Sequence, residues 1–275
     1  MGDRNSKEDG DGELEVVSDA EKAPREAKNA YEQFRCLEEL IASAISSEYY
    51  QLRPSTLITL NRLAIDGLVT APGRYRLRTM TIPGSPHQPP APDDVPVLVE
   101  EMCDYVNRNW EERSPIHLAA YVMWRLNWIH PFQDGNGRTA RASSYLVLCA
   151  RLGHDLPGEA TMPTHIAGNK HPYYMALEAA DQAHRDGRVH LTDLEHLLEE
   201  TLMKQIRDAA TSPTRSGRPK RSTSGPLAVA SSSSPVVASP HKAMSIEVKV
   251  ALITGVFVTV AAVITATCSS SGAGP

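Results

Sequence analysis

Residues 130–141, HPFQDGNGRTAR, decide how this chain folds, and they bring an imidazole, a carboxylate and two guanidinium groups into one short stretch. Gly135, Asn136 and Gly137 favour a sharp turn, because glycine and asparagine tolerate positive φ. The following residues, 138–152, are rich in Ala, Leu, Arg and Ser and predict a helix. The stretch therefore predicts a tight turn that leads directly into the N-terminus of a helix.

The side chains around this turn suit a metal-bound polyphosphate. The backbone N–H groups of such a turn and the N-terminus of a helix both attract an anion. Arg138 and Arg141 are three residues apart, so both lie on one face of the first helical turn, where forked donors can bind phosphate oxygens. Asp134 is placed to hold Mg²⁺, and His130, with an ordinary pKa of about 6.5, can act as a base. Each residue alone would also fit an ordinary glycine-rich turn with solvated charges, but the whole set favours the polyphosphate site.

The stretch resembles the signature of the Fic family, His-Pro-Phe-x-Asp/Glu-Gly-Asn-Gly/Lys-Arg-x-x-Arg, and matches it at every specified position. The resemblance covers about residues 55–205. Upstream, parts of the segment 72–90 are similar to the family's flap, and downstream, residues 173–177 are similar to the segment that lines its nucleotide pocket. These flanking similarities are much less specific than the signature.

The resemblance implies an enzyme that transfers AMP from ATP to a Ser, Thr or Tyr hydroxyl of another protein and releases pyrophosphate. It implies that His130 deprotonates the target hydroxyl and that Asp134 holds Mg²⁺ on the phosphates of ATP. It also implies that Arg141 supports the phosphates or the acid. The remaining implied phosphate ligands come from the turn and the helix start: Gly135, Asn136, Gly137 and Arg138.

Helical patterns surround the signature and predict a mainly all-α, Fic-type helical bundle. The segment 114–129 begins with Ser114 and Pro115, a good N-cap and first-turn pair, and it is apolar almost all round. We therefore expect a central buried helix that carries His130 at its C-terminal end. Further helices are expected at residues 30–51, 56–67, 93–110, 173–185 and 191–209.

Alternation within the segment 74–82 predicts a short β-hairpin flap. The resemblance favours a role in holding a target peptide by strand addition, and the alternative is a plain connecting hairpin. Tyr173 and Tyr174 can stack on an adenine, and the alternative for both is ordinary packing at the start of a helix. The expected target-docking residues of the flap are Arg76, Leu77, Arg78, Thr79 and Met80.

Changes in composition divide the chain of 275 residues. Residues 1–29 are acidic and poor in large apolar side chains, which predicts a disordered tail. A Fic domain with an N-terminal helical arm is expected over residues 30–209, followed by a flexible Ser/Pro-rich linker at 210–246. The net charge of −5 gives no basic signature, so we expect no nucleic-acid partner.

The C-terminal segment 247–268 predicts a transmembrane helix. Residues 250–268 carry no charge, and at about 1.5 Å per residue they would span about 28 Å, close to the thickness of the hydrocarbon core. A buried helix of a soluble domain is the alternative. Basic residues precede the segment and none follows it. We therefore expect a single-pass, tail-anchored membrane protein with its catalytic domain on the cytoplasmic side.

Several alternatives stay open at this level. The domain could use another nucleotide, act as a kinase or a de-AMPylating enzyme, or serve as a non-catalytic membrane-tethered adaptor. Gly137 favours nucleotidyl transfer, because the kinase-like branch of the family carries lysine at that position. No segment matches the family's inhibitory motif, Ser/Thr-x-x-x-Glu-Gly/Asn. Three forms of control therefore stay open: a separate inhibitor protein, a degenerate internal inhibitor near residues 43–48, or no such control. A homodimer is also possible in sequence terms.

Overall fold

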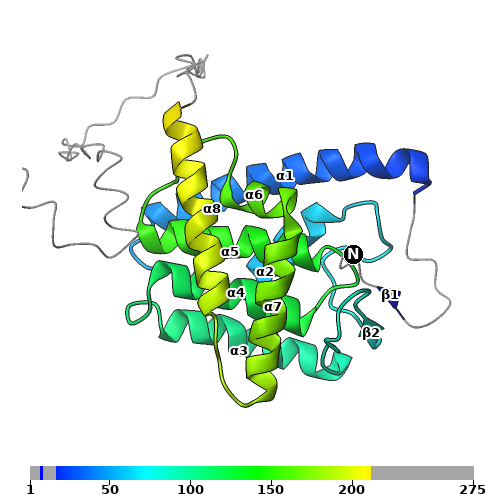
Figure 1. Ribbon diagram of the computed structural model, residues 1–275. Helices are drawn as coiled ribbons and strands as arrows, with labels where there is room; N and C mark the ends of the chain where they lie inside the picture. The colour runs from blue at the N-terminus through cyan, green and yellow to red at the C-terminus, as the bar shows by residue number, and fades with distance from the viewer. Residues whose placement is uncertain (1–6, 9–16, 212–275) are drawn as a thin grey trace, which may run out of the picture. The chain divides into compact units, whose positions relative to one another are not determined.

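The computed structural model describes residues 7–8 and 17–211, and these form a mainly helical unit (Figure 1), which confirms the helical part of the predicted fold. The elements in chain order are β1 (Lys7–Glu8), α1 (Asp19–Ser46), α2 (Pro54–Ala64), β2 (Met80–Thr81), the 3₁₀ helix η1 (Pro92–Asp94), α3 (Val95–Arg108), α4 (Pro115–Ile129), α5 (Asn136–Leu152), α6 (Met162–Gly168), α7 (Lys170–Arg185) and α8 (Thr192–Thr211).

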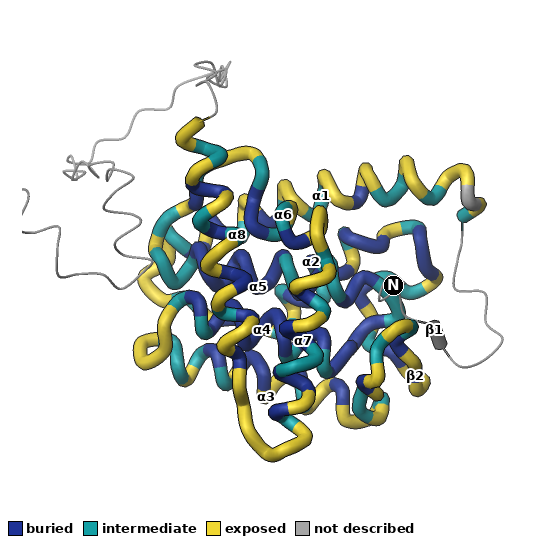
Figure 2. The backbone as a smooth tube through the Cα atoms, viewed as in Figure 1, coloured by how far each residue is buried: buried dark blue, intermediate teal, exposed yellow. Residues whose placement is uncertain are grey.

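Helices α4 and α5 form the centre of this unit and pack on each other more extensively than on any other element. As predicted, α4 starts at Pro115, and the hydroxyl of Ser114 accepts a hydrogen bond from the N–H of His117 at 3.0 Å. Helices α3, α7 and α8 pack against α4, whereas α1, α2 and α6 pack against α5. Most residues of α4 are therefore buried, and Figure 2 colours this helix mainly dark blue.

The signature loop, residues 130–135, connects α4 to α5 and is fixed by its own side chains. Phe132 is fully buried and anchors the loop in the core. The side-chain amide of Asn136 closes the loop, since its Oδ1 accepts from the N–H of Phe132 at 2.9 Å and its Nδ2 donates to the carbonyl of Phe132 at 2.8 Å. Gly135, at φ 75°, then turns the chain into α5.

Helix α1 begins within the segment predicted to be a disordered tail, residues 1–29. The carboxylate of Glu21 accepts from the N–H of Ser18 at 3.3 Å and from its hydroxyl at 2.7 Å, which caps the start of the helix. Asn29 and Gln33 donate to backbone carbonyls just after and within α2, at 2.8 and 3.0 Å. These contacts hold a polar helix in place, so the ordered chain starts earlier than its composition predicts.

The predicted β-hairpin over residues 74–82 is wrong. Strand β2 pairs with β1 in an antiparallel register that places Met80 opposite Glu8. Tyr75 instead forms an isolated antiparallel bridge with Phe132 of the signature loop. The segment does not fold back on itself, because its backbone finds partners in the signature loop and in the N-terminal strand.

The predicted fold class and localisation also need correction where they include a membrane anchor. Among residues 7–8 and 17–211, no helix is both long enough and apolar enough to cross a bilayer. The longest helices, α1 and α8, carry charged side chains along their lengths. A tail-anchored arrangement is therefore not supported. The segments 247–268 and 212–246, on which the anchor and most of the linker were predicted, lie outside the described residues.

Candidate active site

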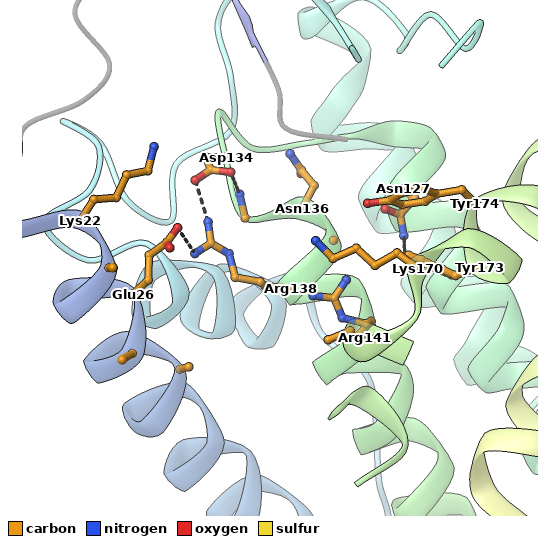
Figure 3. Close-up of a pocket in the computed structure, with 16 residues that line it drawn as sticks. Lys22, Glu26, Asn127, Asp134, Asn136, Arg138, Arg141, Lys170, Tyr173 and Tyr174 are labelled. Carbon is orange, nitrogen blue, oxygen red and sulfur yellow. Dashed lines mark hydrogen bonds and ion pairs between the residues drawn. The ribbon is translucent and has the colours of Figure 1, made fainter. Parts of the chain in front are cut away.

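A cavity of about 650 Å³ lies at the N-terminus of α5 (Figure 3). This volume falls within the range of roughly 300–1,000 Å³ that is typical of small-molecule sites. The walls come from the first half of α1, the signature loop with the start of α5, the end of α4, and helices α6 and α7. Four basic side chains stand against two carboxylates, so the lining suits a polyanion. The charged lining residues are Lys22, Glu26, Asp134, Arg138, Arg141 and Lys170.

Arg138 is held by carboxylates on two sides. Its Nη2 lies 2.7 Å from Oδ2 of Asp134, and its Nη1 lies 3.6 Å from Oε1 of Glu26. The other carboxylate oxygen of Asp134 accepts from the N–H of Gly135 at 2.5 Å. Figure 3 shows the three charged side chains together on one side of the cavity. A phosphate that approaches Arg138 would therefore meet two carboxylates already beside its guanidinium.

Arg141 and Lys170 bring positive charge to the other side of the cavity, where Figure 3 shows their side chains close together. Arg141 projects from the first turns of α5, as the signature predicts. Lys170 starts α7, and sequence reasoning missed it. It belongs to no motif, and only the packing of α7 brings it to the cavity.

The turn before α5 is supported by a buried residue that sequence reasoning also missed, Asn61 of α2. Its Nδ2 donates to the carbonyl of Asp134 at 2.9 Å and to the hydroxyl of Thr139 at 3.2 Å. Its Oδ1 accepts from the N–H of Gly73 at 3.1 Å. Asn61 thus joins the signature loop to the start of the flap segment, which we define as residues 72–91. An asparagine on the apolar face of the predicted helix 56–67 is the signal that could have identified it.

His130 ends α4 and is not part of the cavity lining. It is 2 % exposed, and its Nδ1 lies 3.2 Å from the carbonyl oxygen of Asn127, which does line the cavity. Because a carbonyl only accepts, Nδ1 carries the proton, and Nε2 is the basic nitrogen of the neutral ring. The residue as a whole is buried in this structure.

Three of the predicted nucleotide ligands, Asn136, Tyr173 and Tyr174, differ in how far they are exposed. Asn136 lines the cavity, but it is 2 % exposed and its side chain closes the signature loop. Tyr173 also lines the cavity, but it is 1 % exposed and its hydroxyl accepts from Nδ2 of Asn127 at 2.7 Å. Tyr174 is partly exposed and lines the cavity, with its ring 5.6 Å from that of Tyr173.

The five predicted docking residues of the flap segment divide by exposure. Leu77 is 89 % exposed, and Arg78 and Thr79 are also exposed. Arg76 and Met80 are buried, at 1 % and 4 %. The expectation that Arg76 faces a target is therefore wrong, because its guanidinium is turned inward to backbone carbonyl groups.

Glu26 contributes an acid to the cavity that sequence reasoning did not identify. It lacks the family's inhibitory motif, because Lys22 stands where that motif has Ser or Thr. The alternative of a degenerate inhibitor near residues 43–48 lies at the opposite end of α1, whereas the lining residues of α1 all belong to its first half. Only the packing of α1 on α5 brings Glu26 to the signature.

Asp134 fits a Mg²⁺ ion that the substrate helps to hold. Its side chain is 30 % exposed at the cavity. Within the described part of the chain, no cluster of three or more His, Cys, Asp or Glu residues could bind a metal by itself. Mg²⁺ is commonly held by one or two carboxylates together with substrate phosphates and water, so a single acid beside a polyanion cavity meets this requirement.

Comparison with known proteins points to the family that the signature indicates. The model of the Fic/DOC family matches residues 51–148. The chain is 33 % identical over 133 residues to protein adenylyltransferase Fic of Nematostella vectensis, a match that covers 47 % of this chain and 28 % of that protein. It is 39 % identical over 70 residues to protein adenylyltransferase Fic of Drosophila willistoni, covering 25 % of this chain and 14 % of the relative. The chain thus spans less than a third of the length of these curated relatives.

A solved structure shows the same relationship. The fold is similar to that of a Fic family protein from Desulfovibrio desulfuricans G20, with a TM-score of 0.52 and 25 % identity, over 68 % of this chain and 54 % of that chain. The matched segment 51–148 contains the whole signature, the helix α4 that ends at His130, and most of α5. Residues 51–148 are therefore similar in sequence to the Fic/DOC family.

Proposed function

We propose that this chain is a protein adenylyltransferase, which transfers AMP from Mg·ATP to a Ser, Thr or Tyr hydroxyl of a target protein. The observation that carries the proposal is the positively charged cavity at the N-terminus of α5, with a carboxylate on its lining and the signature histidine beside one of its walls. The curated relatives named protein adenylyltransferase support the same reaction.

The cavity would bind the triphosphate at the start of α5. Backbone N–H groups at a helix N-terminus attract phosphate, and Asn136 and Gly137 at the start of α5 would supply them, whereas the N–H of Gly135 donates to Asp134. Arg141 and Lys170 add charge from the opposite side. Arg138 would exchange its carboxylate partners for phosphate oxygens, and Tyr174 offers a ring to the adenine. Asp134 would hold Mg²⁺, which neutralises charge on the phosphates when it is bound.

His130 would act as the general base of the transfer. The target hydroxyl oxygen forms a bond to the α-phosphorus, the bond from that phosphorus to the bridging oxygen breaks, and pyrophosphate leaves with the bonding electrons. The hydroxyl proton passes to Nε2 of His130, while the Nδ1–H bond to the carbonyl of Asn127 keeps the ring oriented. Such a transfer depends on alignment and charge neutralisation more than on covalent chemistry by the enzyme.

The exposed part of the flap segment would contact the target. Leu77, Arg78 and Thr79 are all exposed, and a backbone edge next to them already accepts a strand from a distant part of the chain, since β2 pairs with β1. Strand addition to such an edge is a common way to bind an extended peptide.

The test uses the full chain, Mg²⁺ and ATP labelled at the α-phosphate. The wild type should label itself or a protein of a lysate, and His130→Ala should label neither. The matched control is His190→Ala, which changes an exposed histidine in the loop between α7 and α8 and should label like the wild type. EDTA should abolish labelling. A parallel reaction uses ATP labelled at the γ-phosphate, and label from that reaction alone would identify a kinase. Equal labelling by His130→Ala and the wild type would remove this residue from the mechanism.

A further inference from the structure

Arg76 lies under the flap segment and is among the largest fully buried side chains, at 1 % exposed. A buried guanidinium requires partners for its donors. It donates to four backbone carbonyl oxygens: those of His130 (Nε, 2.9 Å), Arg78 (Nη1, 3.0 Å), Pro90 (Nη2, 2.5 Å) and Ile129 (Nη2, 3.4 Å).

These acceptors belong to two separate parts of the chain. Ile129 and His130 lie at the C-terminal end of α4, where carbonyl groups lack partners within the helix and the helix dipole favours a cation. Arg78 and Pro90 belong to the flap segment. The guanidinium therefore joins the flap segment to the main chain of the signature histidine.

The main chain beside Arg76 makes a second connection to the same loop. The N–H of Arg76 donates to the carbonyl of Pro131 at 2.9 Å. Tyr75 bridges Phe132, and their rings are 5.7 Å apart. One arginine thus holds the carbonyl groups of His130 and Pro131, the first with its side chain and the second with its backbone.

His130 depends on such support because it adopts a conformation that is unfavourable for a residue with a Cβ atom. Its φ of 52° and ψ of 58° are left-handed, and within the described residues it is the one non-glycine residue with positive φ. This conformation persists only where the surroundings over-determine it. The N–H of His130 donates to Leu126 at 2.9 Å, and its carbonyl accepts from Arg76.

We infer that Arg76 is a positioning residue for His130 rather than a target-docking residue. It holds the backbone of His130 in the left-handed conformation, so that Nδ1 stays on the carbonyl of Asn127 and Nε2 is the nitrogen offered to a hydroxyl. The kinetic consequence rests on the proposed function, whereas the consequence for the ring tautomer does not. A merely structural role, in which Arg76 only stabilises the flap segment, is the competing account.

Two variants of the full chain separate these accounts. Arg76→Met removes the charge and the donors, and Arg76→Lys keeps the charge but loses the planar fork. Arg74→Met is the matched control, because Arg74 is an exposed arginine of the same segment. Circular dichroism and thermal unfolding establish which variants fold. If Arg76→Met does not fold, Arg76→Lys carries the test.

Two measurements are made on each folded variant. The first is the rate of labelling against ATP concentration, with the chain itself or the lysate protein labelled by the wild type as acceptor. The second is a ¹⁵N-histidine NMR spectrum, in which the signals of His130 are assigned by their loss in His130→Gln. The spectrum reports which ring nitrogen carries the proton, and it needs no activity.

In Arg76→Met we expect the KM for ATP to stay within about two-fold of the wild-type value. The maximal labelling rate should fall on the order of 100-fold, as it does when a catalytic group is displaced. Arg76→Lys should show a smaller fall in the maximal rate. The Nδ1–H form of His130 should give way to a mixture of tautomers in Arg76→Met. Arg74→Met should match the wild type in both measurements.

The inference is overturned if a folded Arg76→Met keeps the wild-type tautomer and rate, or if it raises the KM for ATP at an unchanged maximal rate. An equal fall in Arg74→Met would point to a general effect of the flap segment and would also overturn it. If the wild type labels no acceptor, the proposed function fails, while the tautomer comparison still decides the role of Arg76.

Discussion

At Gly135 the chain turns into α5 with no space for a side chain. A Cβ atom there would lie 2.6 Å from Cγ2 of Ile65 and 3.0 Å from Nδ2 of Asn61. Gly135→Ala combines left-handed strain of about 1–2 kcal/mol with overpacking of about 1–3 kcal/mol. We expect the free energy of unfolding, measured by urea titration, to fall by roughly 2–5 kcal/mol.

Gly137→Ala is the matched control for this prediction. Gly137 lies in the first turn of α5, and its Cβ would meet only Nη1 of Arg141, at 3.3 Å, the end of a flexible side chain. Alanine is favoured over glycine in a helix by about 1 kcal/mol, so stability should change little. Equal destabilisation by the two substitutions would show that the positive φ of Gly135 is not what restricts this site.

If the proposed nucleotide binds at Arg138, Glu26 competes with it for the guanidinium. The 3.6 Å ion pair is partly exposed, and exposed pairs are worth about 0.2–1 kcal/mol. Glu26→Gln should therefore tighten Mg·ATP binding by up to roughly five-fold in calorimetry. Glu32→Gln, which removes a carboxylate 3.6 Å from Arg35 on the same helix but outside the cavity lining, should leave the affinity unchanged. Weaker binding to Glu26→Gln would show that Glu26 assists the nucleotide.

At the scale of the elements, Gln205 connects α8 to the rest of the helical unit. It is fully buried, and its Oε1 accepts from the N–H of Met162 at 2.7 Å. Its Nε2 donates to the hydroxyl of Tyr145 and to the carbonyl of Pro157, both at 2.9 Å. Gln205→Ala leaves these buried groups unpaired and opens a small cavity.

We expect Gln205→Ala to lower the free energy of unfolding by roughly 2–4 kcal/mol in urea titrations. Gln182→Ala is the control, because Gln182 is exposed on α7 and its loss should change stability by less than about 0.5 kcal/mol. A similar small effect at position 205 would mean that water replaces all three of its bonds.

The packing of α7 against α4 makes stability depend on pH. Burial lowers the pKa of His184, and the positive charge of Arg125 lowers it further. Among the weaker influences, Asp181 raises this pKa and His87 lowers it. The ring of His184 stacks edge-on against two tryptophans of α4. Between the lowered pKa of the folded chain and the unfolded pKa of about 6.5, the imidazole of His184 therefore binds a proton in the unfolded chain but not in the folded chain. The stability that His184 contributes is complete above about pH 6.5 and is lost as the pH falls toward its lowered pKa.

His184→Gln should remove this dependence. In urea titrations between pH 5 and pH 7.5, the difference in stability between wild type and variant should shrink as the pH falls, with a slope of at most about 1.4 kcal/mol per pH unit for one proton. His190→Gln, at an exposed histidine of the α7–α8 loop, should run parallel to the wild type. A constant difference for His184→Gln would contradict the lowered pKa.

At the scale of the described unit, two buried cysteines report global unfolding. Burial raises the pKa of both Cys103 and Cys149 to about 12, and both are almost inaccessible. Thiolate is the reactive form, so at pH 8 both should react with iodoacetamide only through unfolding. Mass spectrometry should show Cys36, which is partly exposed, reacting before Cys103 and Cys149. Rapid modification of Cys149 in the native protein would reveal local opening of α5.

The centre of the fold was predictable from local signals, whereas its periphery was not. Ser114 and Pro115 mark the start of α4, and the apolar character of that helix predicts its central place. The first turns of α1 are polar, and contacts with α2 through Asn29 and Gln33 hold them. Helix α6 was missed because a seven-residue helix leaves too few turns for a periodic pattern. The alternation of the flap segment was misleading because Arg76 reads as exposed but satisfies its charge on backbone carbonyls.

The candidate site shows the same division. Asp134, Arg138 and Arg141 meet at one cavity because they are neighbours in sequence around a turn and a helix start. Glu26 and Lys170 reach the cavity only through the packing of α1 and α7, so no local pattern marks them. The burial of His130 depends on tertiary contacts in the same way, and the signature alone cannot predict it.

The two carboxylates on Arg138 also affect how the chain should respond to dissolved salt. A bare cluster of cations loses affinity for an anion steeply as ionic strength rises, because counterions screen the attraction. When an incoming phosphate replaces Asp134 or Glu26 at the guanidinium of Arg138, an ion pair within the protein is exchanged for an ion pair with the phosphate. Salt weakens both ion pairs, so its effects on the exchange partly cancel. The affinity for a triphosphate should therefore change less between dilute and concentrated buffers than the number of basic groups around the cavity would imply.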